Sequence, residues 1–317
     1  MEKASFREAF GKALVEVGAK NPNVVVLAAD VSSSVMTDYF AKKFPERFFN
    51  VGIQEAGMVD VGVGFALAGM IPFVNTFAGL FLRTVEQIRT CIAYAETNVK
   101  LVGGYSGVSD FKDGPTHHSI MDIAVMRAMP NLVVVAPADA TEVKKILLLV
   151  AEHDGPVYMR ISRADTPLVF DENHKVEIGK GVLLQEGSDV TLIGSGVMVS
   201  RCLEAANILS EEGISARVIN IHTIKPLDIS LIRKAAEKTG AIVSAEEHSV
   251  IGGLGTAVAE ALGDVCPVPL ERVGIADTFT ETALSFESLL DHYGMAVEDM
   301  VKAAKRALRR KEKGEKS

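Results

Sequence analysis

Tryptophan is absent from the 317-residue chain, and aromatic residues of all kinds make up only 6% of it. Hydrophobic residues nonetheless account for 48%, so the core has to be built mainly from Val, Ile, Leu and Ala. Such an aliphatic composition is typical of buried parallel strands that are covered by helices on both faces. The length exceeds that of one ordinary core and predicts two domains.

Cysteine and clustered positive charge are also scarce. The three cysteines, Cys91, Cys202 and Cys266, lie far apart and lack the spacing of metal ligands. This usage favours a reduced, cytosolic setting over a disulfide framework. The net charge is −8, and no dense Lys/Arg stripe occurs before the last residues, so we expect no binding to nucleic acid.

Long apolar runs are missing too. The longest, near residues 62–70, is too short and too rich in glycine to cross a bilayer. The first residues do not contain the apolar core of a signal peptide. We therefore expect a cytoplasmic protein that does not bind membranes. Residues 309–317 are nearly all charged or small and are expected to form a disordered tail.

Apolar, strand-like runs alternate with helical patterns along the whole chain, which predicts an α/β protein with two doubly wound domains and mainly parallel sheets. Prolines and charges without a sustained period mark residues 166–180 as a linker. The predicted domains are therefore 1–165 and 181–308. Strands are expected near residues 24–27, 132–136, 156–161, 190–193, 217–221, 241–245 and 270–273.

Polar residues follow several of these strands, where open α/β sheets bind their ligands. Asp30 and Arg163 each come just after a strand. Gly194-Ser195-Gly196 does so as well, but a tight turn explains it as readily as a dinucleotide site. For Glu246-Glu247-His248, at another strand end, we expect a structural or interface role.

Glu55 begins a segment with four glycines in the next fifteen residues. Each glycine inside a helix costs about 1 kcal/mol relative to alanine, so this segment is expected to need the close approach of a helix or a ligand. Taken alone, Glu55 is equally well explained as an acid in the first turn of a helix, favoured by the helix dipole.

Two further segments leave alternatives open. In Asp113–His118 a Gly-Pro turn presents a carboxylate and two histidines together. The segment is either a polar substrate or proton-transfer site or merely an exposed loop. A metal site is the third alternative, although no further ligands follow at a usable spacing. Thr76–Arg83 is typical of core followed by a solvated face. Arg160 and Arg163, at a strand end, suit either a phosphate site or a surface ion pair.

Taken together and in this order, the motifs resemble the C-terminal half of a transketolase, in which a pyrimidine-binding domain precedes a C-terminal domain. The resemblance covers about residues 6–307. It is carried most specifically by Ala29-Asp30, Gly52-Ile53-Gln54-Glu55, Pro72-Phe73-Val74-Asn75-Thr76-Phe77, Glu86-Gln87-Ile88-Arg89, Asp113-Gly114-Pro115-Thr116-His117 and Ile161-Ser162-Arg163.

The resemblance implies thiamine diphosphate as cofactor. Glu55 then corresponds to the glutamate that hydrogen-bonds the aminopyrimidine ring and so promotes removal of the proton from the thiazolium carbon. Asp30 corresponds to the acid near the thiazolium ring, and Phe77 to one wall around the pyrimidine. Leu80 stands where an aromatic residue is often found, so either Phe81 replaces that residue or the pyrimidine packs on an aliphatic side chain.

The implied sugar-binding residues are Asp113 and His117, which correspond to the family's contacts with the sugar hydroxyls; His117 could also shuttle protons. Ser34 and Arg163 correspond to residues that hold the terminal phosphate of the acceptor. Tyr105 replaces a histidine that helps hold that phosphate, which leaves the usual sugar-phosphate set open. Arg83, next to the implied cofactor site, stands where some members have a tyrosine.

One family motif is absent: no Gly-Asp-Gly occurs in the chain. Transketolases use this motif, in their N-terminal half, to hold the cofactor's diphosphate through a metal ion. The resemblance therefore implies a separate N-terminal transketolase subunit that carries the diphosphate and Mg²⁺ or a similar divalent ion. It also implies a heterotetramer built around a homodimer of this chain.

The implied function is that of the C-terminal subunit of a split transketolase, which transfers a two-carbon ketol unit from a ketose, or its phosphate, to an aldose or its phosphate. Alternatives are the β subunit of a 2-oxo acid dehydrogenase, half of a deoxyxylulose-phosphate-synthase-like enzyme and a non-catalytic regulatory homologue. Tyr105 also leaves open a relative that acts on an unusual, branched or sulfonated sugar.

Overall fold

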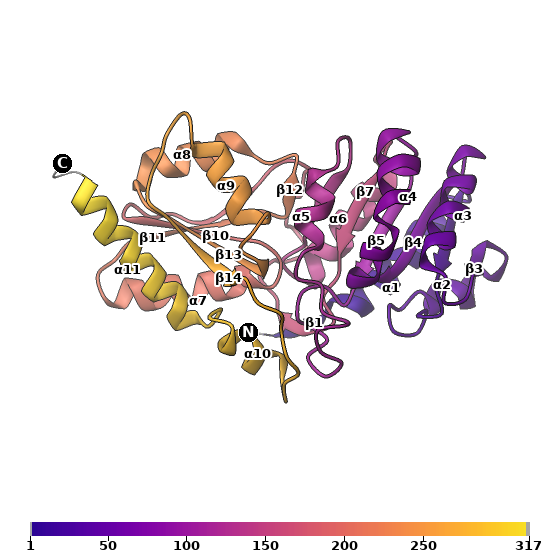
Figure 1. Ribbon diagram of the computed structural model, residues 1–317, viewed down its shortest axis with the longest axis horizontal. Coiled ribbons are helices and arrows are strands. Elements are labelled where there is room, and N and C mark those ends of the chain that lie inside the picture. The colour runs from indigo at the N-terminus through magenta and orange to yellow at the C-terminus, as the bar shows by residue number, and fades with distance from the viewer. Residues whose placement is uncertain (1, 315–317) are drawn as a thin grey trace.

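The computed structural model describes residues 2–314 and consists of two α/β domains side by side (Figure 1). The expected architecture of two domains with mainly parallel sheets is confirmed. The first sheet has the strand order β12-β6-β7-β5-β4-β2-β3, and all of its strands except β12 run parallel. Its strands are β2 (Val24–Ala28), β3 (Phe48–Asn50), β4 (Ile71–Phe77), β5 (Lys100–Gly104), β6 (Val133–Val135), β7 (Val157–Arg160) and β12 (Thr223–Lys225).

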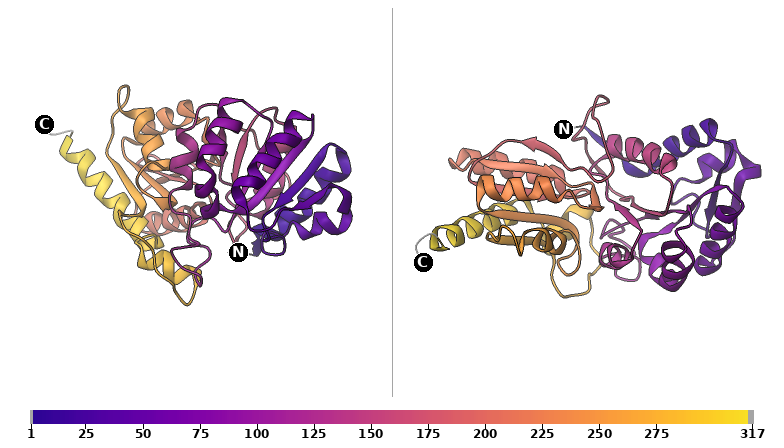
Figure 2. Two further views of the ribbon diagram at one scale, coloured as in Figure 1. Left: turned by 45° about the vertical axis from the view of Figure 1, so that its right-hand side comes forward. Right: turned by 90° about the horizontal axis from the view of Figure 1, so that it is seen from above.

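Helices cover both faces of this sheet, as the views in Figure 2 show. The buried strand residues are mostly Val, Leu and Phe, as the aliphatic composition indicates. The helical elements of the first domain are α1 (Phe6–Lys20), α2 (Asp38–Lys43), η1 (Pro45–Arg47), α3 (Glu55–Leu67), η2 (Ala78–Thr84), α4 (Val85–Gln87), η3 (Ile88–Tyr94), α5 (Asp122–Ala128) and α6 (Ala140–Glu152).

The second sheet has the order β14-β13-β10-β11-β9, with β9 antiparallel at its edge. Helices α7 and α11 pack together below it, and α8 and α9 pack above it in the view of Figure 1. Its elements are β9 (Val182–Gln185), β10 (Val190–Gly194), α7 (Met198–Glu211), β11 (Ala216–Asn220), α8 (Ile229–Thr239), β13 (Ile242–Ser249), α9 (Leu254–Leu262), β14 (Leu270–Ile275), α10 (Phe286–His292) and α11 (Val297–Gly314).

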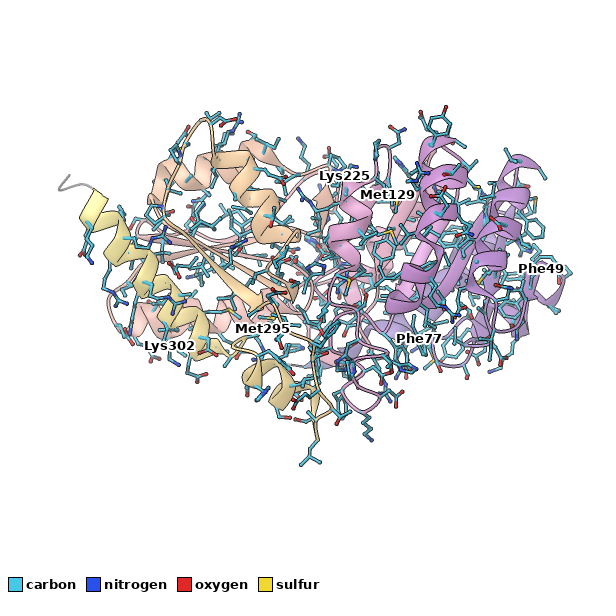
Figure 3. The ribbon with its side chains drawn as sticks, viewed as in Figure 1. Phe49, Phe77, Met129, Lys225, Met295 and Lys302 are labelled. Atoms are coloured by element: carbon cyan, nitrogen blue, oxygen red, sulfur yellow. The ribbon has the colours of Figure 1, made fainter. Side chains whose placement is uncertain are left out.

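The two domains share backbone pairing. Strand β12 comes from the second half of the chain, yet it completes the first-domain sheet by pairing with β6. Beside this pairing, Lys225 donates a hydrogen bond to the carbonyl of Met129, and Figure 3 labels both residues at the junction. A second connection is the antiparallel pair of β1 (Lys3–Ser5) and β8 (Asp165–Pro167).

Asp139 caps the start of α6, and the same side chain anchors the predicted linker. One carboxylate oxygen of Asp139 accepts a hydrogen bond from the Glu142 N–H at 2.8 Å, which caps the helix. The other oxygen accepts from the N–H groups of Val169 and Phe170 at 2.7 and 2.8 Å. The side chain of Glu142 caps the N–H of Ala138 rather than that of Asp139, one residue earlier than in a regular capping box.

The expected tail at residues 309–317 is wrong for most of its length, because α11 continues to Gly314. Two of its basic residues there have partners on the second domain. Arg310 donates to the carbonyl of Leu270 at 3.0 Å and pairs with Glu271 at 2.8 Å. Lys311 donates to the carbonyl of Thr239 at 3.1 Å. The remainder of the predicted tail, residues 315–317, lies outside the described residues.

A buried ion pair fastens the base of α5 to the sheet. The carboxylate of Asp122 accepts hydrogen bonds from the Tyr158 hydroxyl and from Nε of Arg160, both at 2.7 Å. Both charged side chains are almost fully buried. Burial alone would raise the pKa of Asp122, but the Arg160 guanidinium and the Tyr158 hydroxyl hold it below its usual value.

Within residues 2–314, no helix is long and apolar enough to cross a membrane.

We predict that Asp122→Ala lowers the free energy of unfolding by about 3–5 kcal/mol, because it leaves the Arg160 charge buried without its carboxylate. Chemical denaturation followed by circular dichroism measures the loss. Since the folded-state pKa of Asp122 lies below its unfolded value, its contribution is present at neutral pH and disappears as the pH falls below about 4.

The matched control is Asp38→Ala. Asp38 pairs with an exposed Lys42 four residues along α2, and such pairs contribute about 0.3–0.5 kcal/mol. If the two variants lost equal stability, the Asp122 ion pair would not hold the structure in the way that its burial indicates.

Candidate active site

The candidate site lies at the edge of the first sheet where the parallel strands end. The strand register pairs Ala28 of β2 with Asn75 of β4, and Phe77 of β4 with Gly104 of β5. The carboxyl ends of neighbouring strands therefore meet at one edge, as the fold class requires. Figure 3 shows Phe77 at this lower edge of the first domain.

Glu55 is the first residue of α3, in the segment that follows β3. Only 4% of its surface is exposed. Its Oε2 lies 3.5 Å from Nη1 of Arg83, whose own side chain is 65% exposed. No hydrogen bond to the carboxylate comes from residues 2–314. Because buried acceptors are rarely left without a donor, this carboxylate has unused capacity to bind a polar group of a ligand.

Three rings lie together near the ends of β4 and β5. Phe77 stacks on Tyr105, with ring centroids 4.2 Å apart and an interplanar angle of 23°. The His117 ring lies 6.0 Å from Phe77, at an angle of 57°. Tyr105 and Asp30 have left-handed backbones, with φ values of 56° and 59°. Such strain costs about 1–3 kcal/mol for residues other than glycine and concentrates at functional sites.

Asp30 lies in a turn that Asn50 fixes. The side-chain oxygen of Asn50, at the end of β3, accepts hydrogen bonds from the N–H groups of Asp30 at 3.0 Å and of Gly52 at 3.1 Å. This joins the end of β2 to the segment that leads into Glu55. The carboxylate of Asp30 is exposed, and Asn50 donates to it at 3.4 Å.

Two guanidinium groups surround Tyr105. Arg163 lies 5.2 Å from the ring centroid, and its charge is balanced by the buried carboxylate of Asp110 at 2.5 Å. Arg7 of α1 lies 5.5 Å from the same centroid and donates to the Tyr105 hydroxyl at 3.3 Å and to the Ser34 carbonyl at 3.1 Å. Within residues 2–314 no carboxylate pairs with Arg7. The cation of Arg7 therefore remains available to an anion, whereas that of Arg163 is largely neutralised.

Arg7 and Asp110 are site residues that the sequence did not indicate. Asp110 lies beside the predicted residue Asp113; burial first, and then Asp113, raise the pKa of Asp110, while the Arg163 guanidinium lowers it. Arg7 is one polar residue on an ordinary amphipathic helix, and its position in the sequence does not indicate a binding role. The closeness of Asp110 to Asp113 in the sequence is the one pattern that could have identified it.

The adjacent histidines of the Asp113–His118 segment point different ways. His117 is partly exposed, and its Nδ1 lies 3.0 Å from the Thr116 hydroxyl. His118 is buried between the Thr280 hydroxyl, at 2.6 Å from Nδ1, and the Asp110 carbonyl, at 2.9 Å from Nε2. Burial lowers the pKa of His118. The part of the chain that the structure describes has no group of three or more His, Cys, Asp or Glu side chains suited to a metal.

The placement of Phe81 corrects the expectation that it could line the cofactor site. Phe81 is fully buried and packs edge-on against Tyr158 at 6.1 Å, so it belongs to the core. Leu80, its neighbour in η2, is partly exposed. Of the two alternatives raised by Leu80, the aliphatic contact is therefore the one that this arrangement favours.

Comparison with known proteins agrees with this geometry. Residues 2–168 match the family model described as transketolase, pyrimidine binding domain, and residues 179–300 match that of the transketolase C-terminal domain. The chain is 39% identical to the 6-deoxy-6-sulfo-D-fructose transketolase subunit of Clostridium sp. (strain MSTE9), over 98% of this chain and 97% of that protein.

Two further relatives are of the same kind. A subunit of the apulose-4-phosphate transketolase of Phocaeicola vulgatus is 38% identical, over 94% of this chain and 96% of its own length. A solved structure described as a split gene transketolase, inactive beta4 tetramer, is 45% identical, with a TM-score of 0.89 over 98% of this chain and all of that one. This chain therefore belongs to the transketolase family, in which it corresponds to the C-terminal subunit of a split transketolase.

Proposed function

We propose that this chain provides the pyrimidine-binding and sugar-binding half of a split transketolase and acts only together with a separate N-terminal subunit. The observation that supports this most strongly is the buried Glu55 carboxylate with unused acceptor capacity, at the same sheet edge as Phe77 and Arg7. These residues fit the pyrimidine end of thiamine diphosphate. When bound, that cofactor supplies the electron sink for the transferred two-carbon unit.

We assign the remaining cofactor half to the partner. The 317 residues lack Gly-Asp-Gly, so the diphosphate and its Mg²⁺ or similar ion need another polypeptide segment. The relatives that this chain covers almost from end to end are named as separate subunits, which favours a separate chain. A cytoplasmic heterotetramer with a homodimer of this chain at its centre completes the proposal, with functional domains at 1–165 and 181–308.

Within this half-site each acidic residue has a distinct role. Glu55 holds a proton between its carboxylate and a ring nitrogen of the cofactor, in a site from which most water is excluded. Asp30 lies beside the thiazolium end. Leu80 and Phe77 give the pyrimidine an aliphatic and an aromatic contact, and Arg83 occupies the exposed side of Glu55.

The sugar binds on the other side of Phe77. Asp113 and His117 bind the hydroxyls next to the reacting carbons, and His117 also moves protons. Ser34 and Arg163 bind the anionic end of the sugar, and Arg7, which pairs with no carboxylate of residues 2–314, supplies the positive charge that Asp110 largely neutralises on Arg163. A phosphate and a sulfonate both present negatively charged oxygens that a guanidinium recognises. A sulfo-sugar is therefore a candidate substrate beside sugar phosphates, as the name of the Clostridium relative indicates for that protein.

The direct test is reconstitution. We expect the purified chain to show no ketol transfer with D-xylulose 5-phosphate and D-ribose 5-phosphate, 6-deoxy-6-sulfo-D-fructose or apulose 4-phosphate as probes. Addition of its N-terminal partner, thiamine diphosphate and Mg²⁺ should produce activity with at least one probe in a coupled assay. Full activity without the partner would contradict the half-enzyme proposal.

Glu55 gives a sharper test of mechanism. In the reconstituted enzyme, Glu55→Gln should lower kcat by about 10²–10⁴, because an amide cannot share a proton with the ring nitrogen. Steady-state kinetics at saturating cofactor measures the effect. Asp60→Asn, an exposed acid on the same helix, is the control and should leave kcat unchanged. A rate within threefold of normal for the Gln variant would remove Glu55 from the chemical step.

Arg7 tests the anion site. We expect Arg7→Ala to raise KM for a phosphorylated acceptor by about 10- to 100-fold, since a hydrogen bond to a charged group contributes about 1.5–3 kcal/mol. For D-ribose, the same sugar without its phosphate, KM should change little. Arg7→Lys keeps the charge, so its KM for the phosphorylated acceptor should lie between those of the wild type and Arg7→Ala. An equal rise for both acceptors would mean that Arg7 positions Tyr105 rather than binding an anion.

A further inference from the structure

The loop that carries Asp113 and His117 is closed at its base by a short backbone pairing. The N–H of Gly107 donates to the carbonyl of Ser119 at 3.1 Å, and the N–H of Ser119 donates back at 2.8 Å. Residues 108–118 therefore leave and re-enter the first domain at one point. Figures 1 and 2 show this magenta loop beside the orange loop that follows β14 in the second domain.

A carboxyl group of the second domain meets the loop at this base. Oε1 of Glu247 in β13 accepts a hydrogen bond from the N–H of Val108 at 2.7 Å. The two residues are 139 positions apart in the sequence. Glu247 is 3% exposed. The approach is so close that a Cβ on Gly107 would lie 2.2 Å from the carboxyl carbon, and Gly107 also has a φ of +62°. A side chain at this position would displace the Glu247 carboxyl group and strain the left-handed backbone, which glycine adopts freely.

The other end of the same base is held by Arg160. Its Nη2 donates to the carbonyls of Ser119 and Glu247, at 3.2 and 3.3 Å. Further along the loop, the N–H of Ala283 in the second domain donates a hydrogen bond to the carbonyl of Phe111 at 2.8 Å. Thr280 of the same domain contacts His118. The second domain thus holds the loop that presents the proposed sugar-binding residues at Val108, Phe111 and His118, in addition to the contacts from Arg160 and Arg163 of the first domain.

We propose that Glu247 is a positioning residue for the sugar site: by holding Val108 it fixes the loop in which Asp113 and His117 face the substrate. This inference rests on the proposed ketol-transfer function. It gives the C-terminal domain a part in substrate binding in addition to assembly. Glu247 does not reach the reacting atoms and acts through the loop alone.

The chemical state of Glu247 supports a role based on geometry rather than charge. Burial raises its pKa to about 8, although the Arg160 guanidinium opposes this. Asp122 on α5 and Arg201 on α7 are the other charged groups that act on it. At neutral pH most Glu247 side chains are therefore neutral acids, and a glutamine, with the same shape and a neutral acceptor oxygen, should replace it well.

The test compares three variants of the full chain, each assembled with its N-terminal partner. Glu247→Ala should raise KM for D-xylulose 5-phosphate at least tenfold and leave the affinity for thiamine diphosphate within threefold. Glu247→Gln should keep KM within threefold of the wild type. Hydrogen exchange with mass spectrometry should show exchange at residues 106–119 at least tenfold faster in the Ala variant and unchanged in the Gln variant.

Glu246→Ala is the matched control. Glu246 is equally buried on the same strand, but its oxygens accept from the N–H groups of Leu254 and Gly255 within its own domain, at 2.6 and 2.8 Å. This variant should lose thermal stability without changing KM or loop exchange. An unchanged KM in Glu247→Ala, or a Gln variant as impaired as the Ala variant, would overturn the proposal.

The exchange measurement separates this proposal from the proposed function. If the wild-type complex transferred no ketol unit to any probe, the function would be wrong, and the exchange rates would still decide whether Glu247 holds the loop. If exchange in the Ala variant equalled that of the wild type, the positioning role would fail even in an active enzyme.

Discussion

The buried guanidinium of Arg160 is the charge on which the rest of the arrangement depends. It pairs with Asp122 at the start of α5, with the carbonyl of Ser119 at the base of the sugar-binding loop, and with the carbonyl of Glu247 in the second domain. Because a buried charge needs its hydrogen-bonding partners, movement of any one of these three elements would leave part of the guanidinium unpaired. Arg160 therefore links the loop, α5 and the second domain through one buried charge.

The sequence predicted much of the fold because buried parallel strands leave long aliphatic runs. It made Glu55, Phe77 and His117 candidates for the site because their motifs occur in a familiar order, and their roles stay predictions. It could not predict Arg7, which approaches Tyr105 across 98 residues, or the pairing of Arg163 with Asp110 across 53. It also could not decide between Leu80 and Phe81, since only packing against Tyr158 shows which of the two apolar neighbours faces the core.

Tyr105 is the departure from the family pattern that the structure describes most fully. In place of the family's histidine there is a ring that stacks on Phe77 and has two guanidinium groups around it. The hydroxyl accepts a hydrogen bond from Arg7, and the backbone of Tyr105 is left-handed. The substitution therefore replaces a small, titratable contact by a wide aromatic platform.

Strand β12 limits how this protein can be divided during evolution. The family models separate the chain between residues 168 and 179, yet β12, from the far side of that gap, covers the edge of β6. A gene truncated at the linker would encode a sheet with an open backbone edge, which invites pairing with other chains and aggregation. Recombination at this point would need a new edge strand from the incoming partner.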